Sequence, residues 1–327
     1  MKAVWYEELG PAREVLKSGE MESPDPGPGE VRVKLHASGV NPADVKRRGL
    51  GTYGMEHPHI IPNSDGAGVI DALGDGVSGL EAGQRVWLFN GQRQGRAFGT
   101  AAEYITLASW LVAPLPDDLS FDEGACLGIP CMTGHHNVFS DGPVNGKTVL
   151  VTGGAGAVGH YAVQWANRGG ATVIATVSSD AKAAHAIAGG AHHTINYRDP
   201  DAADQILELT DGDGVERIVE VDLAANLDLT SKVLATGGTI AVYATTGDPQ
   251  NLMLRMALRN AIIRFMVLHS VPRTAIDAAR ADIVTWLAEG HGLHTVAGTF
   301  PLGQCAEAHE FVESGDKLGT VIVRPAD

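Results

Sequence analysis

The chain has 327 residues, enough for about two domains, and 44% of them are hydrophobic and 19% charged, which is the composition of a folded protein with a large core. The formal net charge of −15 excludes a general basic surface that would hold nucleic acid or an anionic membrane. We therefore expect a small-molecule partner, no nucleic acid and no membrane.

The first part of the chain is predicted to be mostly β-structure. Residues 1–10 and 30–37 carry apolar side chains at strand positions, and we expect them to be strands of a half-exposed antiparallel sheet. The proline- and glycine-rich residues 24–29 between them predict a loop. A β-rich domain therefore opens the protein.

A turn and a short helix are expected within residues 38–54. Pro42 suits the first helical position and Asn41 suits the cap before it. Two further strand candidates, flanked by glycine turns, lie within residues 60–77 and 84–89.

After residue 89 the sequence changes from short strand patterns to a polar loop and then to helical patterns. Residues 90–99 are polar and rich in glycine, so we expect an exposed loop there. From Phe121 the short strands give way to longer helical segments, and a second domain is expected to begin near this residue.

A glycine-rich turn marks the centre of the second domain. The apolar residues 149–151 predict a buried strand, and Gly154, Gly156 and Gly159 follow in the G-x-G-x-x-G spacing before a helical pattern. Such glycines permit a tight turn, close approach of the backbone to a pyrophosphate and close packing of helix on strand. A second β-rich run over 171–177 completes a βαβ unit, which favours a dinucleotide site over a structural turn.

Strands and helices continue to alternate, which predicts a parallel, doubly wound α/β sheet. A helix-like stretch over 252–267 and a strand candidate over 265–268 close this unit. The tail predicts helices over 275–287 and 305–312 and a last strand over 319–323. A strand after the sheet has ended indicates that the chain returns to the first domain.

The sequence also favours a cytoplasmic protein. No apolar run approaches the ~20 residues of a membrane span, and the N-terminus has acidic residues where a signal peptide has its apolar core. Cys126, Cys131 and Cys305 are too few and too scattered for a disulfide framework, so we expect reduced thiols.

Nine segments, in order along nearly the whole chain, carry a family resemblance: 39–44, 48–53, 65–69, 83–86, 102–104, 128–133, 149–159, 195–198 and 306–309. In these segments the chain resembles the zinc-free, zeta-crystallin-like quinone oxidoreductases of the medium-chain dehydrogenase/reductase superfamily. The resemblance implies a GroES-like, mostly β catalytic domain with a Rossmann domain inserted into it, and an active site in the cleft. The implied division is 1–123 for the first part of the catalytic domain, 124–267 for the NADP-binding domain and 268–327 for the return segment.

The resemblance further implies a homodimer that uses NADPH. Zinc-dependent relatives hold their metal with a Cys near Asn41 and a Gly-His-Glu motif. This chain has no thiol there and reads Asn63-Ser64-Asp65 at the motif, and residues 90–99 lack the four cysteines of a structural site. Zinc requires thiolate and imidazole ligands, so we expect no metal.

The end of the second Rossmann strand bears on the choice of cofactor. An NAD site usually has an acid there for the ribose hydroxyls, whereas this chain places Val177 and Ser178 there with Lys182 one turn later. Hydroxyl and ammonium groups suit a 2′-phosphate, which favours NADPH. If the strand is longer, Asp180 stands at its end and could bind the ribose hydroxyls of NAD, so use of NAD stays open as an alternative.

By resemblance, Asn41, Tyr53 and Thr133 line the nicotinamide end of the cleft. Tyr53 either donates a hydrogen bond to the substrate oxygen or packs on the cofactor, and both interpretations stay open. Asp44 is interpreted as a helix-turn acid rather than a general base. The expected catalytic residues are Tyr53 and Asn41. The expected cofactor-binding residues are Asn41, Thr133, Gly154, Gly156, Ala157, Val158, Gly159, Ser178, Lys182, Tyr197, Tyr243 and Ala244.

The resulting hypothesis is an NADPH-dependent reductase that transfers hydride to quinones or other α,β-unsaturated carbonyls without a metal, mainly through proximity and orientation. An enoyl or alkenal double-bond reductase shares the same motifs and remains an alternative. A non-enzymatic role, structural or RNA-binding, is an alternative of another class, and the acidic charge disfavours RNA. Alcohol oxidation is disfavoured by the missing zinc ligands.

Overall fold

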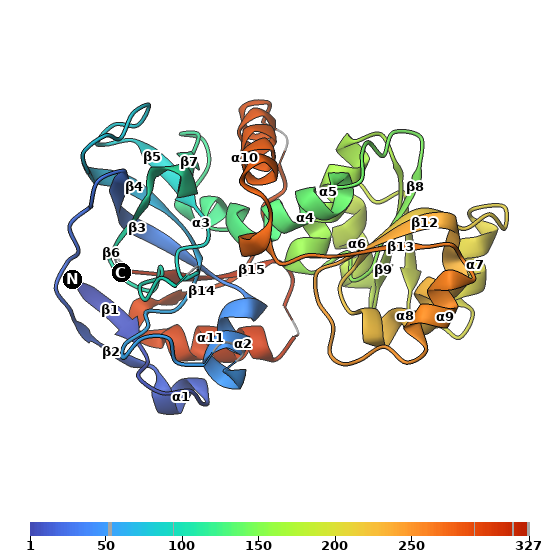
Figure 1. The fold of residues 1–327 in the computed structure, drawn as a ribbon, viewed down its shortest axis with the longest axis horizontal. Coiled ribbons are helices and arrows are strands. Elements are labelled where there is room, and N and C mark those ends of the chain that lie inside the picture. Colours follow the sequence, from blue (N-terminus) through green and yellow to red (C-terminus); the bar gives the residue numbers. More distant parts are fainter. Residues whose placement is uncertain (52–53, 94, 291, 316, 326–327) are drawn as a thin grey trace. The chain divides into compact units, whose positions relative to one another are not determined.

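The computed structural model describes residues 1–51, 54–93, 95–290, 292–315 and 317–325 (Figure 1). The chain divides into two compact units. One unit comprises Met1–Pro130 and Arg280–Asp327, and the other comprises Cys131–Ala279. The junctions thus follow Pro130 and Ala279, whereas the division expected from the sequence has them after residues 123 and 267.

The second unit contains a parallel sheet of six strands in the order β10-β9-β8-β11-β12-β13. Its strands are β8 (Thr148–Val151), β9 (Thr172–Val177), β10 (His193–Asn196), β11 (Val215–Glu220), β12 (Leu234–Val242) and β13 (Ile262–Phe265). Strand order reverses between β8 and β11, as in a doubly wound dinucleotide-binding fold. The predicted parallel α/β sheet is confirmed.

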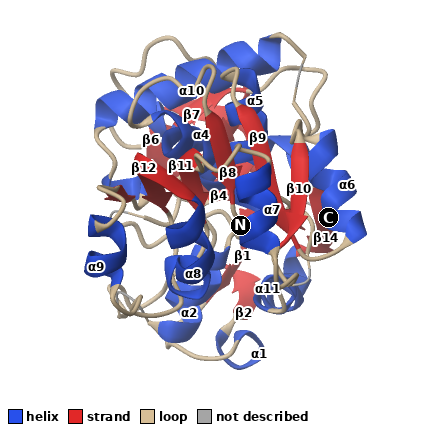
Figure 2. Ribbon diagram, turned by 90° about the vertical axis from the view of Figure 1, so that its right-hand side faces the viewer, coloured by secondary structure: helices blue, strands red, loops and turns tan. Residues whose placement is uncertain are grey.

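Helices cover this sheet (Figure 2). They are α4 (Met132–Phe139), α5 (Ala157–Arg168), α6 (Asp180–Ala188), α7 (Ala202–Glu208), α8 (Leu223–Val233) and α9 (Leu252–Ala257). Helix α4 packs on α5, and α7 packs on α8. The expected helix over 252–267 is wrong in its length: α9 ends at Ala257, and β13 begins at Ile262 rather than at 265. Asn260, with a φ of 49°, interrupts the helical pattern between them.

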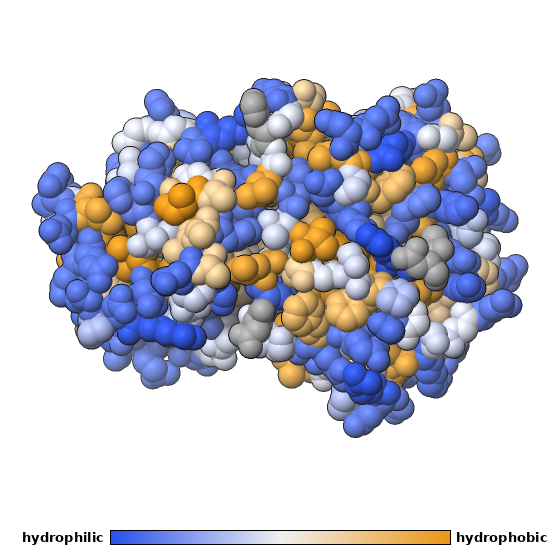
Figure 3. All heavy atoms as spheres, turned by 180° about the vertical axis from the view of Figure 1, so that it is seen from behind, coloured by the Kyte–Doolittle hydropathy of each residue, from blue (hydrophilic) through white to orange (hydrophobic). Residues whose placement is uncertain are grey.

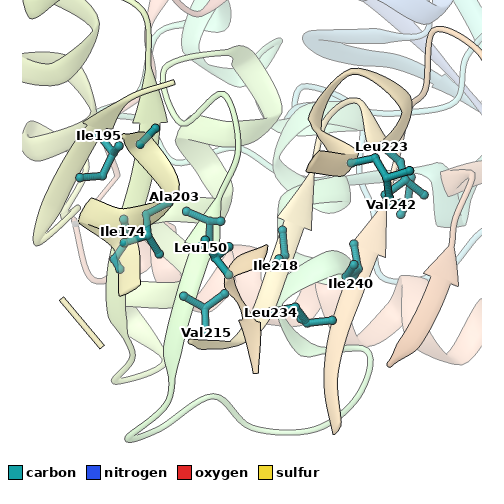
Figure 4. Packing of buried hydrophobic residues seen from close by; sticks show 14 of the residues in the cluster. Leu150, Ile174, Ile195, Ala203, Val215, Ile218, Leu223, Leu234, Ile240 and Val242 are labelled. Atoms are coloured by element: carbon teal, nitrogen blue, oxygen red, sulfur yellow. The ribbon is translucent and has the colours of Figure 1, made fainter. Parts of the chain in front are cut away.

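The pleat of the strands determines which side chains form the core of the second unit. Successive side chains of a strand point to opposite faces, so alternate residues of neighbouring strands form one layer, with Leu150, Ile174, Ile218 and Ile240 fully buried. Figure 4 shows this layer together with residues from the adjoining helices. Burial of one such aliphatic side chain contributes about 1.5–3 kcal/mol.

The first unit contains a seven-stranded sheet in the order β14-β15-β3-β4-β5-β7, with β6 paired to β3. Its strands are β3 (Glu30–Val40), β4 (Asp65–Leu73), β5 (Arg85–Leu88), β6 (Tyr104–Ala108), β7 (Val112–Pro114), β14 (Val296–Pro301) and β15 (Thr320–Arg324). Because β15 pairs antiparallel with β3, the chain returns to its first domain, as predicted.

Other elements of this unit flank the sheet. They are β1 (Lys2–Trp5), α1 (Ala12–Val15), β2 (Lys17–Glu20), α2 (Pro42–Leu50), α3 (Phe121–Gly124) and α11 (Cys305–Glu313), while α10 (Arg273–Ala288) crosses the junction between the units. The strand at the N-terminus pairs with β2 and not within the large sheet. The turn expected at residue 38 is wrong, because β3 continues to Val40 and helix α2 follows directly after Asn41.

Hydrophilic residues occupy most of the face drawn in Figure 3, with hydrophobic residues scattered among them. No helix in the described part of the chain combines the length and the apolar character needed to cross a bilayer.

Candidate active site

The glycine-rich turn joins β8 to α5 at the point where strand order reverses. A Cβ atom on Gly159 would lie 2.2 Å from the carbonyl oxygen of Gly153, and one on Gly154 would lie 2.6 Å from Cβ of Ala175. Both positions therefore require glycine. The N–H groups of Ala157 and Val158 open helix α5, where no preceding turn supplies carbonyl acceptors, and can bind an anion.

Two threonines hold this turn. Oγ1 of Thr176 accepts a hydrogen bond from Gly153 N–H over 3.0 Å. Oγ1 of Thr152 donates to Oε1 of Glu220 over 2.9 Å and accepts from Val221 N–H over 2.9 Å. These residues were not among those predicted from the sequence, although Thr152 directly follows the predicted strand over 149–151 and Thr176 is the last residue but one of the run over 171–177.

The residues at the end of β9 form a small polar cluster. Nζ of Lys182 donates to Oγ of Ser178 over 3.2 Å, and Tyr197 N–H donates to the carbonyl of Val177 over 3.1 Å. Tyr197 is 47% exposed. Because β9 ends at Val177 and Asp180 is the first residue of α6, the alternative in which Asp180 stands at the strand end does not hold.

Glu220 ends β11 in a buried position. Its Oε1 atom accepts hydrogen bonds from Thr152 Oγ1, from Asn226 Nδ2 over 2.7 Å and from Asp222 N–H over 2.7 Å. Burial raises the pKa of the Glu220 carboxyl, against these hydrogen bonds. Tyr243 N–H donates to the backbone carbonyl of Glu220 over 3.1 Å, so the Glu220 backbone joins the ends of β11 and β12, while its carboxyl holds Thr152 of the glycine turn.

The predicted cofactor residues of the second unit thus fall at one edge of one sheet. The glycine turn, Ser178, Tyr197 and Tyr243 follow the carboxyl ends of β8, β9, β10 and β12, and parallel strands present these ends together. Thr133 differs, since it lies in the first turn of α4, which packs on α5, β11 and β12.

The first unit gathers a second polar cluster around the start of α2. Nδ2 of Asn41 donates to Oδ2 of Asp65 over 2.7 Å, and Asn41 N–H donates to Oδ2 of Asp44 over 2.9 Å. Oδ1 of Asp44 accepts from Ser64 Oγ over 2.7 Å and from Arg93 over 2.8 Å. Asn41 thus stands at the N-cap of α2 and Asp44 in its first turn, as predicted.

The loop over 90–99 differs from the expectation of an exposed loop. Gln92 and Arg93 are buried, because the Arg93 guanidinium pairs with Asp44 and donates to the carbonyl of Gln92 over 2.7 Å. A charged side chain is buried where it finds such a partner. Tyr53, expected to be catalytic, lies outside the described residues.

Two family models match the chain. The model described as an alcohol dehydrogenase GroES-like domain matches residues 27–117, and that described as a zinc-binding dehydrogenase matches residues 157–279. The chain is similar to a quinone oxidoreductase of Rattus norvegicus, with 32% identity over 99% of this chain and 97% of that protein. The chain belongs to the quinone oxidoreductase family of the medium-chain dehydrogenases/reductases. The GroES-like and Rossmann parts of the expected fold are thereby confirmed.

Two further proteins are similar to this chain. The chain is 30% identical to a 2-haloacrylate reductase of a Burkholderia species, over 99% of both chains. A mycobacterial structure solved in complex with NADPH superposes with a TM-score of 0.89 and 29% identity, over 99% of this chain and 100% of that one.

Asn63 and Ser64, which were expected at the position of the zinc motif, are both held by hydrogen bonds. Asn63 Nδ2 donates to Ser38 Oγ over 3.0 Å, and Asn63 Oδ1 accepts from Nε2 of His309 over 2.9 Å. Ser64 donates to Asp44. Within the described ranges no three His, Cys, Asp or Glu side chains are grouped to hold a metal ion.

Proposed function

We propose that this protein is a cytoplasmic, NADPH-dependent reductase that transfers hydride to quinones or related α,β-unsaturated carbonyls without a metal ion. The observation that carries the proposal is the glycine turn after β8 beside the Ser178–Lys182 pair after β9. One binds a diphosphate through backbone N–H groups, and the other suits a 2′-phosphate in place of the acid typical of NAD sites.

NADPH, when bound, supplies a hydride to an electron-poor carbon of the substrate. The residues of this chain bind the nucleotide and orient it for the transfer. We propose that Gly154, Gly156 and Gly159 let the backbone approach the diphosphate, and that Ala157 and Val158 donate their N–H groups to it. We propose Ser178, Lys182 and Tyr197 for the adenosine phosphate, and Thr133, Tyr243 and Ala244 for the nicotinamide half.

Asn41 and Tyr53 are proposed as the catalytic residues of the first unit. A carbonyl oxygen gains negative charge as hydride is transferred, and a fixed hydrogen-bond donor stabilises that charge. The proposal gives this role to the Tyr53 hydroxyl, with Asn41 positioning the reactants. The hydrogen bond from the Asn41 side-chain amide to Asp65 supports the positioning role of Asn41. Tyr53 lies outside the described residues.

Independence from zinc is supported by the chemistry of the residues at the motif positions. Asn63 and Ser64 offer an amide and a hydroxyl, each engaged in a hydrogen bond, and neither group is among the thiolate, imidazole and carboxylate ligands that zinc takes. Asp65 is the one carboxylate of the three, and its Oδ2 atom is engaged by Asn41 and Ile129. Addition of zinc or of a chelator is expected to leave the reduction rate unchanged. A rate that falls with chelator and returns with zinc would contradict this part of the proposal.

Reduction of an activated carbon–carbon double bond is the second candidate, because the similarity extends to a 2-haloacrylate reductase. Turnover of 1,4-benzoquinone, 9,10-phenanthrenequinone, 2-haloacrylate and a 2-alkenal, each with NADPH and with NADH, separates the two candidates. The proposal predicts faster consumption of NADPH with a quinone. Faster consumption with the 2-alkenal or 2-haloacrylate would favour the alternative.

A homodimer formed through β13 is part of the proposal. This strand lies at the edge of its sheet, and an unpaired edge strand is a template for pairing with another chain. Large apolar side chains are exposed on β13, at Ile262 (52%) and Phe265 (62%), and on the segment that precedes it in the chain, at Met253 (85%), Leu254 (64%) and Leu258 (77%). Light scattering after size exclusion is expected to give a dimer, and Ile262→Lys a monomer; a monomeric wild type would contradict the proposal.

The cytoplasmic location is supported by the cysteines. Cys126, Cys131 and Cys305 are all free and buried, as expected of a protein made in a reducing compartment. Cell fractionation tests this location, and recovery of the native protein outside the cytoplasm would contradict it.

A further inference from the structure

Asp65, the first residue of β4, is completely buried and is not among the residues predicted from the sequence to act at the site. Its two carboxyl oxygens have different surroundings. Oδ2 accepts hydrogen bonds from Asn41 Nδ2 over 2.7 Å and from the backbone N–H of Ile129 over 2.9 Å. Oδ1 has no hydrogen-bond partner in the described part of the chain.

The chain around Asp65 is shaped to admit this carboxyl. A Cβ atom on Gly128 would lie 2.1 Å from Oδ1 of Asp65, and a Cβ on Gly39 would lie 3.3 Å from Cβ of Asp65. Gly128 also has a ψ of −115°, outside the helical region, in the segment Leu127–Cys131. This non-helical conformation of Gly128 directly precedes Ile129, whose N–H donates to Asp65.

Stability does not account for an acid at this position. A buried carboxyl with one unpartnered oxygen costs several kcal/mol relative to a hydrophobic side chain of similar size. The two groups that it holds do suggest a reason. Asn41 is a proposed catalytic residue. Ile129 lies two residues before Cys131, where the second unit begins.

We infer that Asp65 is a positioning residue, whose Oδ2 atom fixes the side-chain amide of Asn41 and the backbone at Ile129 in the arrangement that the reaction requires. This inference rests on the proposed function. Because Oδ2 accepts the amide N–H, the Asn41 side chain cannot rotate to present its oxygen to Asp65. An isosteric Asn at position 65 can still accept both hydrogen bonds, whereas Ala cannot accept either.

The charge on Asp65 is set by burial first and by its charged neighbours second. Burial and the negative charge of Asp44 raise the pKa of Asp65 to about 8, while the hydrogen bonds from Asn41 and Ile129 and the positive charge of Arg93 act in the opposite direction. Cys126 also lies near Asp65, and burial keeps its thiol protonated with a pKa of about 12. Asp65 therefore changes charge near pH 8 beside the Asn41 amide.

The first test uses the cofactor-free protein. Nitrogen-edited NMR, with the Asn41 side-chain signals assigned from Asn41→Ala, is expected to show these signals shifting with an apparent pKa of about 8. The shift is expected to disappear in Asp65→Asn, while Asp71→Asn, on the same strand and paired with Arg32 at the surface, keeps it. Asn41 signals that titrate equally in Asp65→Asn would overturn the inference.

The second test measures turnover with 9,10-phenanthrenequinone and NADPH. Asp65→Ala is expected to lower kcat by about 10- to 100-fold, because a small misplacement of a reacting group costs this much. Asp65→Asn and Asp71→Ala should stay within about threefold of the wild type. A folded Asp65→Ala protein with wild-type kcat overturns the inference. If Asp65→Ala does not fold, the NMR result for Asp65→Asn decides. A wild type that reduces no quinone, but whose Asn41 signals respond to Asp65 as stated, would refute the proposed function and not this hydrogen bond.

Discussion

The Arg93 guanidinium donates a 2.8 Å hydrogen bond to Oδ1 of Asp44, and both side chains are buried, 4% and 0% exposed. This ion pair joins the loop over 90–99 to the first turn of α2, whose cap is Asn41. It therefore connects the stability of the first unit with the position of a proposed catalytic residue.

Arg93→Met is expected to destabilise the protein by about 3–5 kcal/mol, because it leaves Asp44 buried without its counter-charge. Urea unfolding measures this loss. Arg93→Met combined with Asp44→Asn is expected to recover part of it, since the second change removes the uncompensated charge. Purely additive effects of the two changes would contradict a coupled pair.

Lys182→Ala is expected to weaken NADPH binding by about tenfold or more and NADH binding by less than about twofold, because the ammonium group beside Ser178 is proposed to bind the 2′-phosphate. Titration of nicotinamide fluorescence measures both constants. Lys232→Ala, on α8 of the same unit, serves as the control and should alter neither. An equal loss for the two nucleotides would remove the case for a phosphate at this position.

Gly159→Ala is expected to weaken NADPH binding at least about tenfold and to lower stability by about 1–3 kcal/mol, because its Cβ would lie 2.2 Å from the Gly153 carbonyl oxygen and push α5 away from the turn. Gly49→Ala is the matched control. Gly49 lies within helix α2 and has open space around it, so alanine there should add about 0.5–1 kcal/mol of stability. Unimpaired NADPH binding by Gly159→Ala would show that the close contact is not needed.

Acid is expected to destabilise the protein through His309. Burial, followed by the positive charge of Arg48, lowers the pKa of this histidine to about 3, while in the unfolded chain it is about 6.5. The unfolded state therefore binds more protons between pH 6.5 and 3. The contribution of the neutral His309 to the free energy of unfolding is complete above pH 6.5. It is lost by about 1.4 kcal/mol per pH unit as the pH falls from 6.5 towards 3.

His309→Gln tests this assignment, because a glutamine N–H can still donate to Asn63 without taking up a proton. Unfolding measured from pH 7 to 4.5 should show a shallower loss of stability for His309→Gln than for the wild type. The control is the exposed His193→Gln. Parallel curves for wild type and His309→Gln would contradict the buried neutral histidine.

Local patterns predicted much of the fold. The continuous apolar run over 149–151 marked β8, the β-rich run over 171–177 marked β9, and the proline after Asn41 marked the start of α2. The boundaries of α9 and β13 were less accurate, because the apolar residues over 252–267 suit either a helix or a buried strand, and only pairing with β12 selects the strand.

The polar clusters were harder to predict than the strands. The glycine turn and the residues after β9 could be found because short spacings define them. Glu220 and Asp65 could not, since an acid within an apolar run gives no sign that it is buried until distant partners such as Thr152 and Ile129 are placed beside it. Arg93 was expected in solvent for the same reason, as its partner Asp44 is far away in sequence.

We propose that the protein itself reduces a quinone with NADPH and needs no metal ion. The most direct measurement is the rate of NADPH consumption with 9,10-phenanthrenequinone by protein purified in chelator, together with the metal content of the same sample. We expect saturable turnover that exceeds the rate with NADH, with far less than one metal ion per chain. Absence of turnover with any quinone or enone, or turnover that appears only when zinc is bound in stoichiometric amount, would contradict it.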